Sequence, residues 1–358
     1  MDNKNLKKLL IYQDSTIKEA MKQLNESGEK ILFVINKKGQ LKGTVTDGDI
    51  RRSIVNDSQL ETPIFSVMAN NYISISNKIN DKKQLALNLM KKHNVEKIPV
   101  LNDNNEVINV ISWIDFINKN NIKKSTYKNP VVIMAGGKGT RLEPFTKILP
   151  KPLIPLGNKT IIEHIMERFR SNGFNDFFVI VNYKKEMIKM YFNELSSAYN
   201  IKYIEEKQYL GTAGGLTLLK GHINDTFIVT NCDTFLEGEY KEFIKWHKER
   251  NNLLTIIGSY KEITVPYGVL KIKDGCFDSI DEKPKIDILI NSGTYVFEPE
   301  ALDFISEGYC DMDTLIDKVC KSNKDKIDIY PHWCGWFDIG QWDEFKKTLK
   351  YIGDKYEK

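Results

Sequence analysis

The stretch PVVIMAGGKGTRLEPFTKILPKPLIP, residues 130–155, decides the fold of the larger part of this chain. It opens with an apolar run, residues 131–134, that is typical of a buried strand, and it continues into a loop with three glycines. Basic residues then recur without a helix to hold them: Lys138, Arg141, Lys147 and Lys151. Exposed backbone N–H groups and flexible cations suit a polyphosphate, so the sequence predicts a long phosphate-binding loop.

Two common phosphate motifs do not match this stretch. A P-loop requires G-x-x-x-x-G-K-[ST], but Lys138 is followed by a glycine. A dinucleotide fingerprint requires a helix that opens directly on the glycines, and the prolines that follow exclude such a helix. These prolines are Pro144, Pro150, Pro152 and Pro155.

The stretch as a whole resembles the signature of sugar-1-phosphate nucleotidylyltransferases, A-G-G-x-G-T-R-L followed by P-K-P. The resemblance covers roughly residues 129–350 and implies a Rossmann-like, mostly parallel α/β sheet in a domain over residues 130–358. It implies catalytic roles for Arg141 and Lys151. It also implies nucleotide binding by the loop residues Ala135, Gly136, Gly137, Gly139 and Thr140.

Length and composition set the outer limits. A chain of 358 residues is long for one domain, so two are expected. The net charge of +4 gives no reason to expect nucleic acid or an anionic membrane as a partner. No apolar run is long enough to cross a bilayer, and the N-terminus shows no secretion signal. The five cysteines form no C-x-x-C pair, which favours reduced thiols in a cytoplasmic protein.

Residues 1–120 hold two weakly similar copies, about 1–64 and 65–120, at a constant offset. Each copy predicts a helix, two strands joined by a polar turn, and a closing helix. The expected helices and strands are 16–25, 31–35 and 41–46 in the first copy, and 81–93, 98–101 and 107–112 in the second. This order resembles a tandem CBS-domain pair, an α/β module in which neither copy buries its sheet alone. The polar residues 121–129 are expected to form the linker.

The CBS resemblance implies that polar residues at the end of each copy hold the ribose and phosphate of an adenine nucleotide. These residues are Thr46, Asp49, Ser112 and Asp115. Two alternatives stay open. The aspartates also suit N-terminal helix positions, where a carboxylate satisfies free N–H groups, and such pairs also serve only for dimerisation.

Further motifs follow the expected strands. Asp233 closes an apolar strand, residues 226–230, and Asp338 lies in the motif WFDIG. The resemblance makes both of them ligands of Mg2+, which binds through one or two carboxylates together with phosphates. The segment EKQYLGTAGG, residues 206–215, resembles the family's nucleobase loop, with Glu206, Gly211 and Thr212 at the nucleotide.

The nucleobase loop bears on the choice of nucleotide. A carboxylate accepts two hydrogen bonds from guanine N1–H and the 2-amino group, which uracil and thymine cannot donate, and Glu206 therefore favours GTP. An alternative for Thr212 is a cap on the helix that follows the loop.

The segments YGV, EKP and NSGT complete the resemblance on the sugar side. They imply sugar-phosphate binding by Gly268, Glu282, Lys283, Asn291 and Gly293. The chain then ends soon after an expected helix at 342–349, so no acyltransferase domain of hexapeptide repeats is expected.

The inferred reaction is attack of a sugar 1-phosphate on the α-phosphorus of an NTP. The CBS-fused layout resembles guanylyltransferases that make GDP-activated amino sugars for glycans such as legionaminic acid, which suggests glucosamine-1-phosphate as the acceptor. Two alternatives are a UTP-, CTP- or dTTP-dependent enzyme for a hexose or heptose 1-phosphate, and an inactive sensor of nucleotide sugars. A homodimer is expected.

Overall fold

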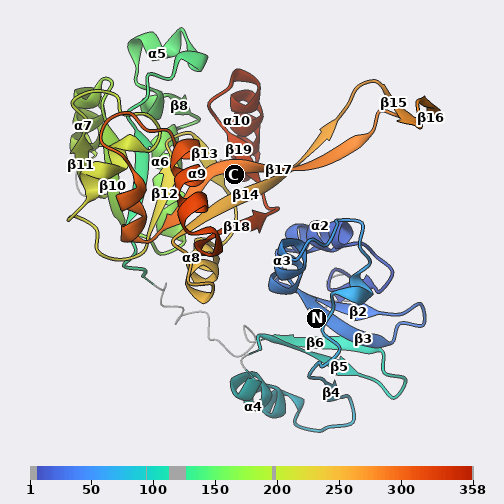
Figure 1. Cartoon of the computed structure of the whole chain (residues 1–358). Coiled ribbons are helices and arrows are strands. Elements are labelled where there is room, and N and C mark those ends of the chain that lie inside the picture. The colour runs from blue at the N-terminus through green and yellow to red at the C-terminus, as the bar shows by residue number, and fades with distance from the viewer. Residues whose placement is uncertain (1–5, 94, 113–125, 196–198, 357–358) are drawn as a thin grey trace. The chain divides into compact units, whose positions relative to one another are not determined.

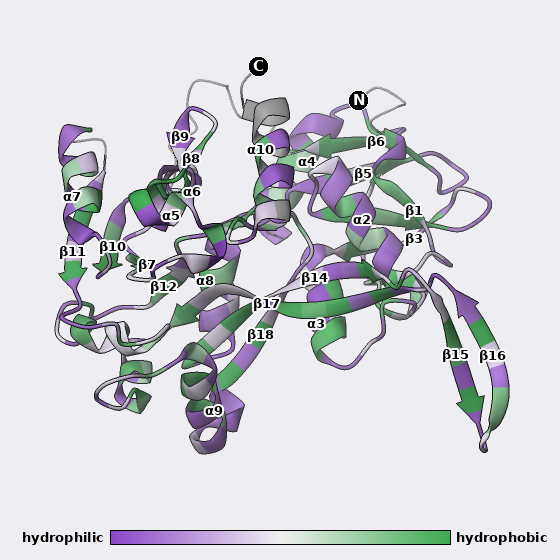
Figure 2. Cartoon of the chain, turned by 90° about the horizontal axis from the view of Figure 1, so that it is seen from above, coloured by the Kyte–Doolittle hydropathy of each residue, from purple (hydrophilic) through white to green (hydrophobic). Residues whose placement is uncertain are grey.

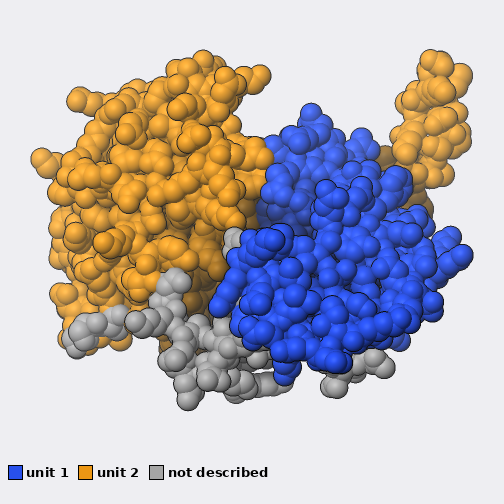
Figure 3. All heavy atoms as spheres, turned by 90° about the horizontal axis from the view of Figure 1, so that it is seen from below, with its two compact units in different colours: residues 1–123 blue, residues 124–358 orange. Residues whose placement is uncertain are grey.

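The computed structural model describes residues 6–93, 95–112, 126–195 and 199–356 (Figure 1). Contacts between Cα atoms divide the chain into two compact units, residues 1–123 and 124–358 (Figure 3). Both units mix helices and strands, as the sequence predicts. Among the described residues, no helix is both long enough and apolar enough to span a membrane.

Unit 1 repeats one arrangement twice. The first copy contains β1 (Leu10–Tyr12), α2 (Ile17–Ser27), β2 (Ile31–Ile35), β3 (Leu41–Thr46) and α3 (Asp47–Val55), and the second contains β4 (Ile75–Ser76), α4 (Lys82–His93), β5 (Lys97–Leu101) and β6 (Val107–Ser112). Each copy forms a three-stranded sheet. The helices and strands expected from the repeat are confirmed, except that the closing helix of the second copy lies outside the described residues.

The two copies of unit 1 share a hydrophobic core. Leu9, Phe33 and Leu41 from the first copy pack with Leu101 and Val107 from the second, and all five are buried. A β-bridge between Gln40 and Glu106 joins the copies at their turns. Neither three-stranded sheet therefore covers its apolar face alone, which is the physical reason for the tandem arrangement.

Unit 2 is built on a seven-stranded sheet. Its order is β11 (Asn200–Glu205), β10 (Asp176–Val181), β7 (Val131–Ala135), β12 (Phe227–Asn231), β17 (Lys285–Phe297), β14 (Leu254–Thr264) and β18 (Ile327–His332). Only β17 runs antiparallel to its neighbours. The predicted mostly parallel sheet is confirmed, and its parallel strands place their carboxyl ends, where ligands bind in such folds, along one edge.

Helices cover the sheet of unit 2. The longer ones are α6 (Ile161–Ser171), α7 (Lys185–Glu194), α8 (Tyr240–Glu249), α9 (Met312–Ser322) and α10 (Trp342–Tyr356). The main core joins β12 and β17 to α9 and to the short 3-10 helices η5 (Gly214–Leu219) and η6 (Pro299–Phe304). Leu216, Leu315 and Val319 are each fully buried there, so the segment after the nucleobase loop and α9 share one apolar layer.

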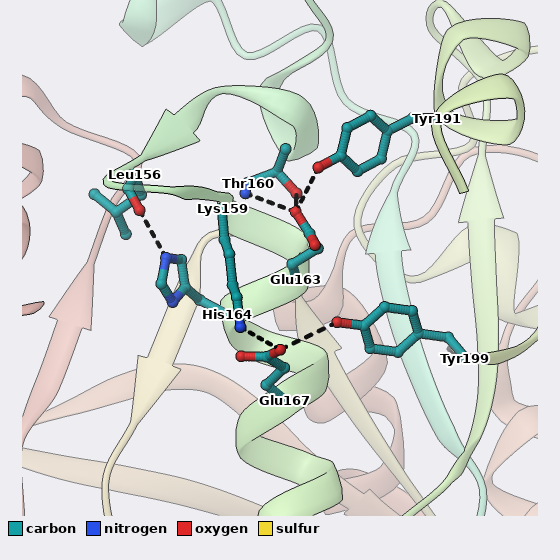
Figure 4. Close-up of polar contacts among 8 residues, drawn as sticks. All are labelled: Leu156, Lys159, Thr160, Glu163, His164, Glu167, Tyr191 and Tyr199. Carbon is teal, nitrogen blue, oxygen red and sulfur yellow. Dashed lines mark hydrogen bonds and ion pairs between the residues drawn. The ribbon is translucent and has the colours of Figure 1, made fainter. Parts of the chain in front are cut away.

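A polar network fixes the start of α6 (Figure 4). The backbone N–H and the hydroxyl of Thr160 both donate to Glu163 Oε2 at 2.9 Å, and the Tyr191 hydroxyl on α7 donates to the same oxygen at 2.5 Å. Burial, with the nearby Glu163 charge, raises the pKa of Tyr191 to about 12. The Ile161 N–H donates to the carbonyl of Ile154 at 3.1 Å, so this network also anchors the chain just after Lys151.

A two-stranded arm leaves the body of unit 2. It consists of β15 (Gly268–Lys273) and β16 (Cys276–Glu282), and it continues the ribbon formed by β14 and β17 (Figure 1). Leu270 pairs with Ile280 and Ile272 with Phe277, and all four side chains are more than half exposed. Figure 2 shows green, hydrophobic segments on both strands of this arm. The sequence motifs predicted a sugar-binding role for Gly268 and did not indicate a projecting arm.

Candidate active site

The glycine-rich loop leaves β7 at the carboxyl edge of the sheet. After Gly136 and Gly137 the chain makes three short turns, η3 (Thr140–Leu142), α5 (Phe145–Ile148) and η4 (Lys151–Leu153), and no long helix opens on the glycines. Gly139 has φ +68°, and a Cβ added there would lie 2.8 Å from the Cβ of Lys151. Only glycine therefore lets the loop fold back this closely on Lys151. Arg141 is exposed on η3.

Lys151, Asp233 and Asp338 converge on one point. A Cβ added to Gly340 would lie 2.6 Å from Asp233 Oδ2, 2.8 Å from Asp338 Oδ1 and 2.8 Å from Lys151 Nζ. The Lys151 ammonium donates directly to Asp233 Oδ2, and both side chains are about 15% exposed (14% and 16%). Gly340 is thus the small residue that leaves room for this charged cluster. It is the last residue of the motif WFDIG, in which only Asp338 was assigned a role.

Two short strands bring the aspartates together across 105 positions of sequence. Thr234 on β13 (Thr234–Leu236) pairs with Asp338 on β19 (Trp336–Asp338), and the Ile339 N–H donates to the Asp233 carbonyl at 2.9 Å. The Gly340 N–H donates to Asp338 Oδ1 at 2.9 Å, which orients that carboxylate. The pairing of β13 with β19 therefore builds the acidic pair that the sequence predicted.

The electrostatics of this cluster suit a cation. Burial lowers the pKa of Lys151, but the charge of Asp233, supported by that of Asp338, outweighs it, so the net shift is upward. The Lys151 ammonium therefore stays charged beside the two carboxylates, where it stands in for a metal cation. Hard carboxylate oxygens are what Mg2+ prefers, so the donor set fits this ion. Among the described residues no group of three or more His, Cys, Asp and Glu could hold a metal, so nucleotide phosphates would have to supply the other oxygens.

Glu206 is buried between two glycines. It follows β11 and is 3% exposed. A Cβ on Gly136 would lie 2.5 Å from its Oε2, and a Cβ on Gly215 would lie 2.5 Å from its Oε1. Burial raises the pKa of Glu206 to about 7, and the backbone N–H of Leu210 offsets the rise only in part. Neither oxygen of Glu206 accepts a hydrogen bond of good geometry from the described residues, so this desolvated carboxyl beside the glycine-rich loop can accept hydrogen bonds from a ligand.

Thr212 does not cap the helix that follows the nucleobase loop, which was the alternative that the sequence left open. The η5 turn after it has no side-chain cap. The Thr212 hydroxyl instead accepts from the Met312 N–H at 2.8 Å, at the start of α9. Gly211, with φ +87°, lies against the Cys310 carbonyl, 2.5 Å from an added Cβ. The segment 308–312 was not singled out by any sequence motif, since its partners lie about 100 positions away.

The predicted sugar residues fall into two groups. Gly293, with φ +79°, lies beside Asn231 and Thr234, which flank Asp233 closely in sequence, and Asn291 Oδ1 accepts from the Gly293 N–H at 3.1 Å. The other group sits on the arm, where Gly268 pairs with Glu282 and Lys283 follows (Figure 1). The structure therefore brings Asn291 and Gly293 toward the acidic pair and leaves Gly268, Glu282 and Lys283 on the projection.

In unit 1, the first pair of predicted ligand residues caps a helix. Thr46 donates from its N–H and its hydroxyl to Asp49 Oδ2 at 2.9 and 2.6 Å, and the Asp49 N–H donates to the Thr46 hydroxyl at 3.1 Å. Arg52 binds the other oxygen of Asp49 at 2.5 Å. This is the capping alternative for α3. Ser112 ends β6, and Asp115 lies outside the described residues.

Known proteins match both units. The nucleotidyl transferase family model matches residues 130–355, and the CBS domain model matches residues 7–56 and 80–120. A mannose-1-phosphate guanyltransferase from Yarrowia lipolytica is 32% identical over 239 residues, which make up 63% of this chain and 65% of that protein. This match thus spans less than two thirds of the guanyltransferase.

Two further proteins are similar. A provisionally assigned glucose-1-phosphate cytidylyltransferase from Bacillus subtilis is 30% identical over 244 residues, covering 61% of this chain and 93% of that protein. The solved structure of a provisionally assigned glucose-1-phosphate thymidylyltransferase from Bacillus anthracis, in complex with sucrose, aligns with a TM-score of 0.50 and 19% identity over 63% of this chain and 95% of that one. The latter likeness concerns the fold alone.

Proposed function

Because this chain belongs to the nucleotidyl transferase family, we propose that it transfers the nucleotidyl group of an NTP to a sugar 1-phosphate. An oxygen of the sugar phosphate forms a bond to the α-phosphorus, the bond from that phosphorus to the bridging oxygen breaks, and pyrophosphate leaves. The observation that carries the proposal is the convergence of Lys151, Asp233 and Asp338 on Gly340, beside the glycine-rich loop.

Charge neutralisation is the main task of such a site, since both reactants are anions. We assign Lys151 to the reacting α-phosphate and the acceptor phosphate, because its ammonium is largely buried and points at the acidic pair. Arg141, exposed on η3, binds the β- and γ-phosphates and stabilises the leaving pyrophosphate. Asp233 and Asp338 would hold Mg2+, which draws negative charge from the phosphates when bound.

For the nucleotide we propose GTP. Both oxygens of Glu206 face glycine-rich backbone, and an ionised carboxylate matches the two donors on the edge of guanine. The similarity to a GTP-dependent enzyme from Yarrowia lipolytica supports this choice, whereas the similarity to a cytidylyltransferase keeps CTP as the second candidate. For the acceptor we propose glucosamine-1-phosphate, from the CBS-fused layout, with a role in precursor synthesis for glycans such as legionaminic acid. On the sugar side, Asn291 and Gly293 would meet the acceptor directly, and Gly268, Glu282 and Lys283 would meet it from the arm.

The test is pyrophosphate release by the full chain. GTP, UTP, CTP, dTTP and ATP are each supplied with Mg2+ and a panel of sugar 1-phosphates that includes glucosamine-1-phosphate. Turnover with GTP and an amino sugar supports the full proposal. Turnover with another nucleotide overturns the base assignment and leaves the reaction class standing. A folded protein that releases no pyrophosphate in any combination contradicts the reaction class and favours a sensor of nucleotide sugars.

Glu206→Gln should change both the base preference and its dependence on pH. The glutamine amide accepts one hydrogen bond and donates another, which suits a pyrimidine edge better than guanine. We expect kcat/KM for GTP to fall about tenfold to a hundredfold, the range for losing a hydrogen bond to a charged group. In the wild type, guanine binds the ionised form, and the pKa of Glu206 lies at about 7. Affinity for GTP should therefore weaken as the pH falls below 7 and level off above it.

Titration of GTP by calorimetry from pH 6 to pH 8 checks this dependence. Glu206→Gln is the control, because its affinity should stay flat across the same range. An affinity of the wild type for GTP that does not change with pH would show that Glu206 does not meet the base.

For unit 1 we propose a regulatory or dimerising role. The closed cap of Thr46, Asp49 and Arg52 would have to open before an adenine nucleotide could use those groups, which favours dimerisation for the first copy. Titration with ATP and AMP, together with the mass of the full chain in solution, separates the two roles.

A further inference from the structure

The nucleobase loop is joined to a second segment by reciprocal hydrogen bonds. The N–H and the hydroxyl of Thr212 both donate to Asp311 Oδ1, at 3.0 and 3.1 Å. In return, the Thr212 hydroxyl accepts from the Met312 N–H at 2.8 Å. Asp311 is the N-cap residue of α9, yet its carboxylate makes no cap bond to its own helix. Thr212 of the nucleobase loop thus caps α9, and Asp311, the N-cap residue of α9, holds the nucleobase loop in place.

Backbone contacts extend this exchange. The N–H groups of Ala213 and Gly214 both donate to the Cys310 carbonyl at 2.9 Å, and the Cys310 N–H donates to the Leu210 carbonyl at 2.9 Å. A Cβ on Gly211 would lie 2.9 Å from Asp311 Oδ1, so no larger residue could hold the loop this close. The two segments are therefore fastened on both sides of Thr212.

Two exposed tyrosines stand beside this junction. The Tyr309 hydroxyl donates to Asp311 Oδ2 at 2.8 Å, so both oxygens of Asp311 are used. The rings of Tyr209 and Tyr309 meet edge to face, with centroids 6.1 Å apart, and are 46% and 65% exposed. Tyr209 lies three positions after Glu206 in the same loop. An anchored pair of aromatic rings thus borders the segment that carries the buried carboxylate.

We propose that Asp311 is a positioning residue for nucleotide binding: through Thr212 and Tyr309 it fixes the nucleobase loop, and so sets the affinity for the NTP without contacting the reacting atoms. This inference rests on the proposed function for its ligand. The reason is one of preorganisation. A loop held in its bound geometry loses less conformational entropy when the ligand binds, so freeing it weakens affinity. Lys151 and the aspartates lie on other segments, so the chemical step itself should change little.

The test compares four single variants and one double variant of the full chain. Asp311→Ala removes the hydrogen bonds that the carboxylate accepts from Thr212 and from Tyr309. Thr212→Val removes the Thr212 hydroxyl and keeps nearly the same side-chain shape. Asp311→Asn keeps an oxygen that can accept from Thr212. Asp313→Ala is the matched control, because Asp313 has the same charge, lies in the first turn of α9 and accepts hydrogen bonds from its neighbour Thr314.

Calorimetry gives the Kd of each variant for the five nucleotides with Mg2+, and kinetics give KM and kcat. For the nucleotide bound most tightly, we expect Asp311→Ala to raise Kd and KM about tenfold, as for the loss of a charge-assisted hydrogen bond. The values of kcat and of KM for the sugar phosphate should stay within about threefold of the wild type, since neither depends on the loop. Asp311→Asn should restore most of the affinity. Thr212→Val combined with Asp311→Ala should cost less affinity than the sum of the two single losses, because both changes remove the bond between the Thr212 hydroxyl and Asp311.

Equal Kd values for Asp311→Ala and Asp313→Ala would overturn the proposal, and so would an Asp311→Asn variant as weak as the alanine. A wild type that binds no nucleotide overturns it as well. A wild type that binds nucleotide but releases no pyrophosphate contradicts the proposed reaction alone, because the comparison of Kd values still decides the role of Asp311.

Discussion

Replacing Lys151 with alanine should lower kcat by about 10²- to 10³-fold, the loss typical of one preorganised group that stabilises charge in a transition state. The ammonium is held at Asp233 in a largely buried position, where electrostatic interactions are stronger than in water. Lys151→Arg should not restore activity, because a planar guanidinium does not reproduce the compact point charge that the ammonium places at Asp233. Single-turnover pyrophosphate release measures the effect.

Lys220→Ala is the matched control for this experiment. Lys220 also pairs with an aspartate, Asp303, at 2.9 Å, but that pair is exposed and lies outside the site. Exposed ion pairs contribute little to the free energy of folding, so the control variant should keep full activity and stability. If Lys151→Ala turned over like Lys220→Ala, the assignment of Lys151 to the reacting phosphate would be wrong.

Gly340→Ala should lower kcat by about 10²-fold, nearly as much as Lys151→Ala, because small displacements of catalytic groups have effects of this size. The added methyl group would fall 2.6–2.8 Å from Asp233, Asp338 and Lys151, all closer than carbon–oxygen or carbon–nitrogen contacts allow. The backbone itself tolerates alanine, since Gly340 is not among the residues with positive φ. The variant therefore tests the spacing of the charges and not backbone strain.

Two measurements check the Gly340 prediction. The melting temperature should change little, because the displaced atoms are the ends of side chains. The Mg2+ concentration for half-maximal rate should rise, because the two carboxylates are forced apart. Wild-type kinetics at every Mg2+ concentration would contradict the convergence described for this site.

The motif at residues 130–155, through its resemblance to a known family, was enough to predict the sheet of unit 2, and the internal repeat was enough to predict the two copies of unit 1. The apolar run of β7 and the repeated strands of unit 1 each depend on neighbours within about ten positions, where periodicity is a strong signal. Asp233 and Asp338 were also predicted, because each sits in a short motif at a strand end. The structure adds that β13 and β19 join them.

Features that depend on residues far apart in the chain could not be predicted from the sequence. Gly340 has its meaning only once three side chains converge on it. Asp311 belongs to no motif, and its bond to Thr212 joins residues 99 positions apart. Glu206 was predicted at the base, but its burial depends on Gly136 from the glycine-rich loop and on Gly215 at the other end of its own segment. The sequence of the arm shows the alternation of apolar and polar residues that is typical of any strand. This periodicity does not reveal whether a two-stranded ribbon packs on the body of unit 2 or projects from it.

The projecting arm also gives the chain a chemical handle. Of the five cysteines, Cys276 at the turn of the arm is the one with an exposed side chain, whereas Cys232 and Cys310 are buried. A maleimide dye should therefore label the arm first and leave the site intact. Its emission would then report whether the ribbon that carries Glu282 and Lys283 changes surroundings when a sugar phosphate is added.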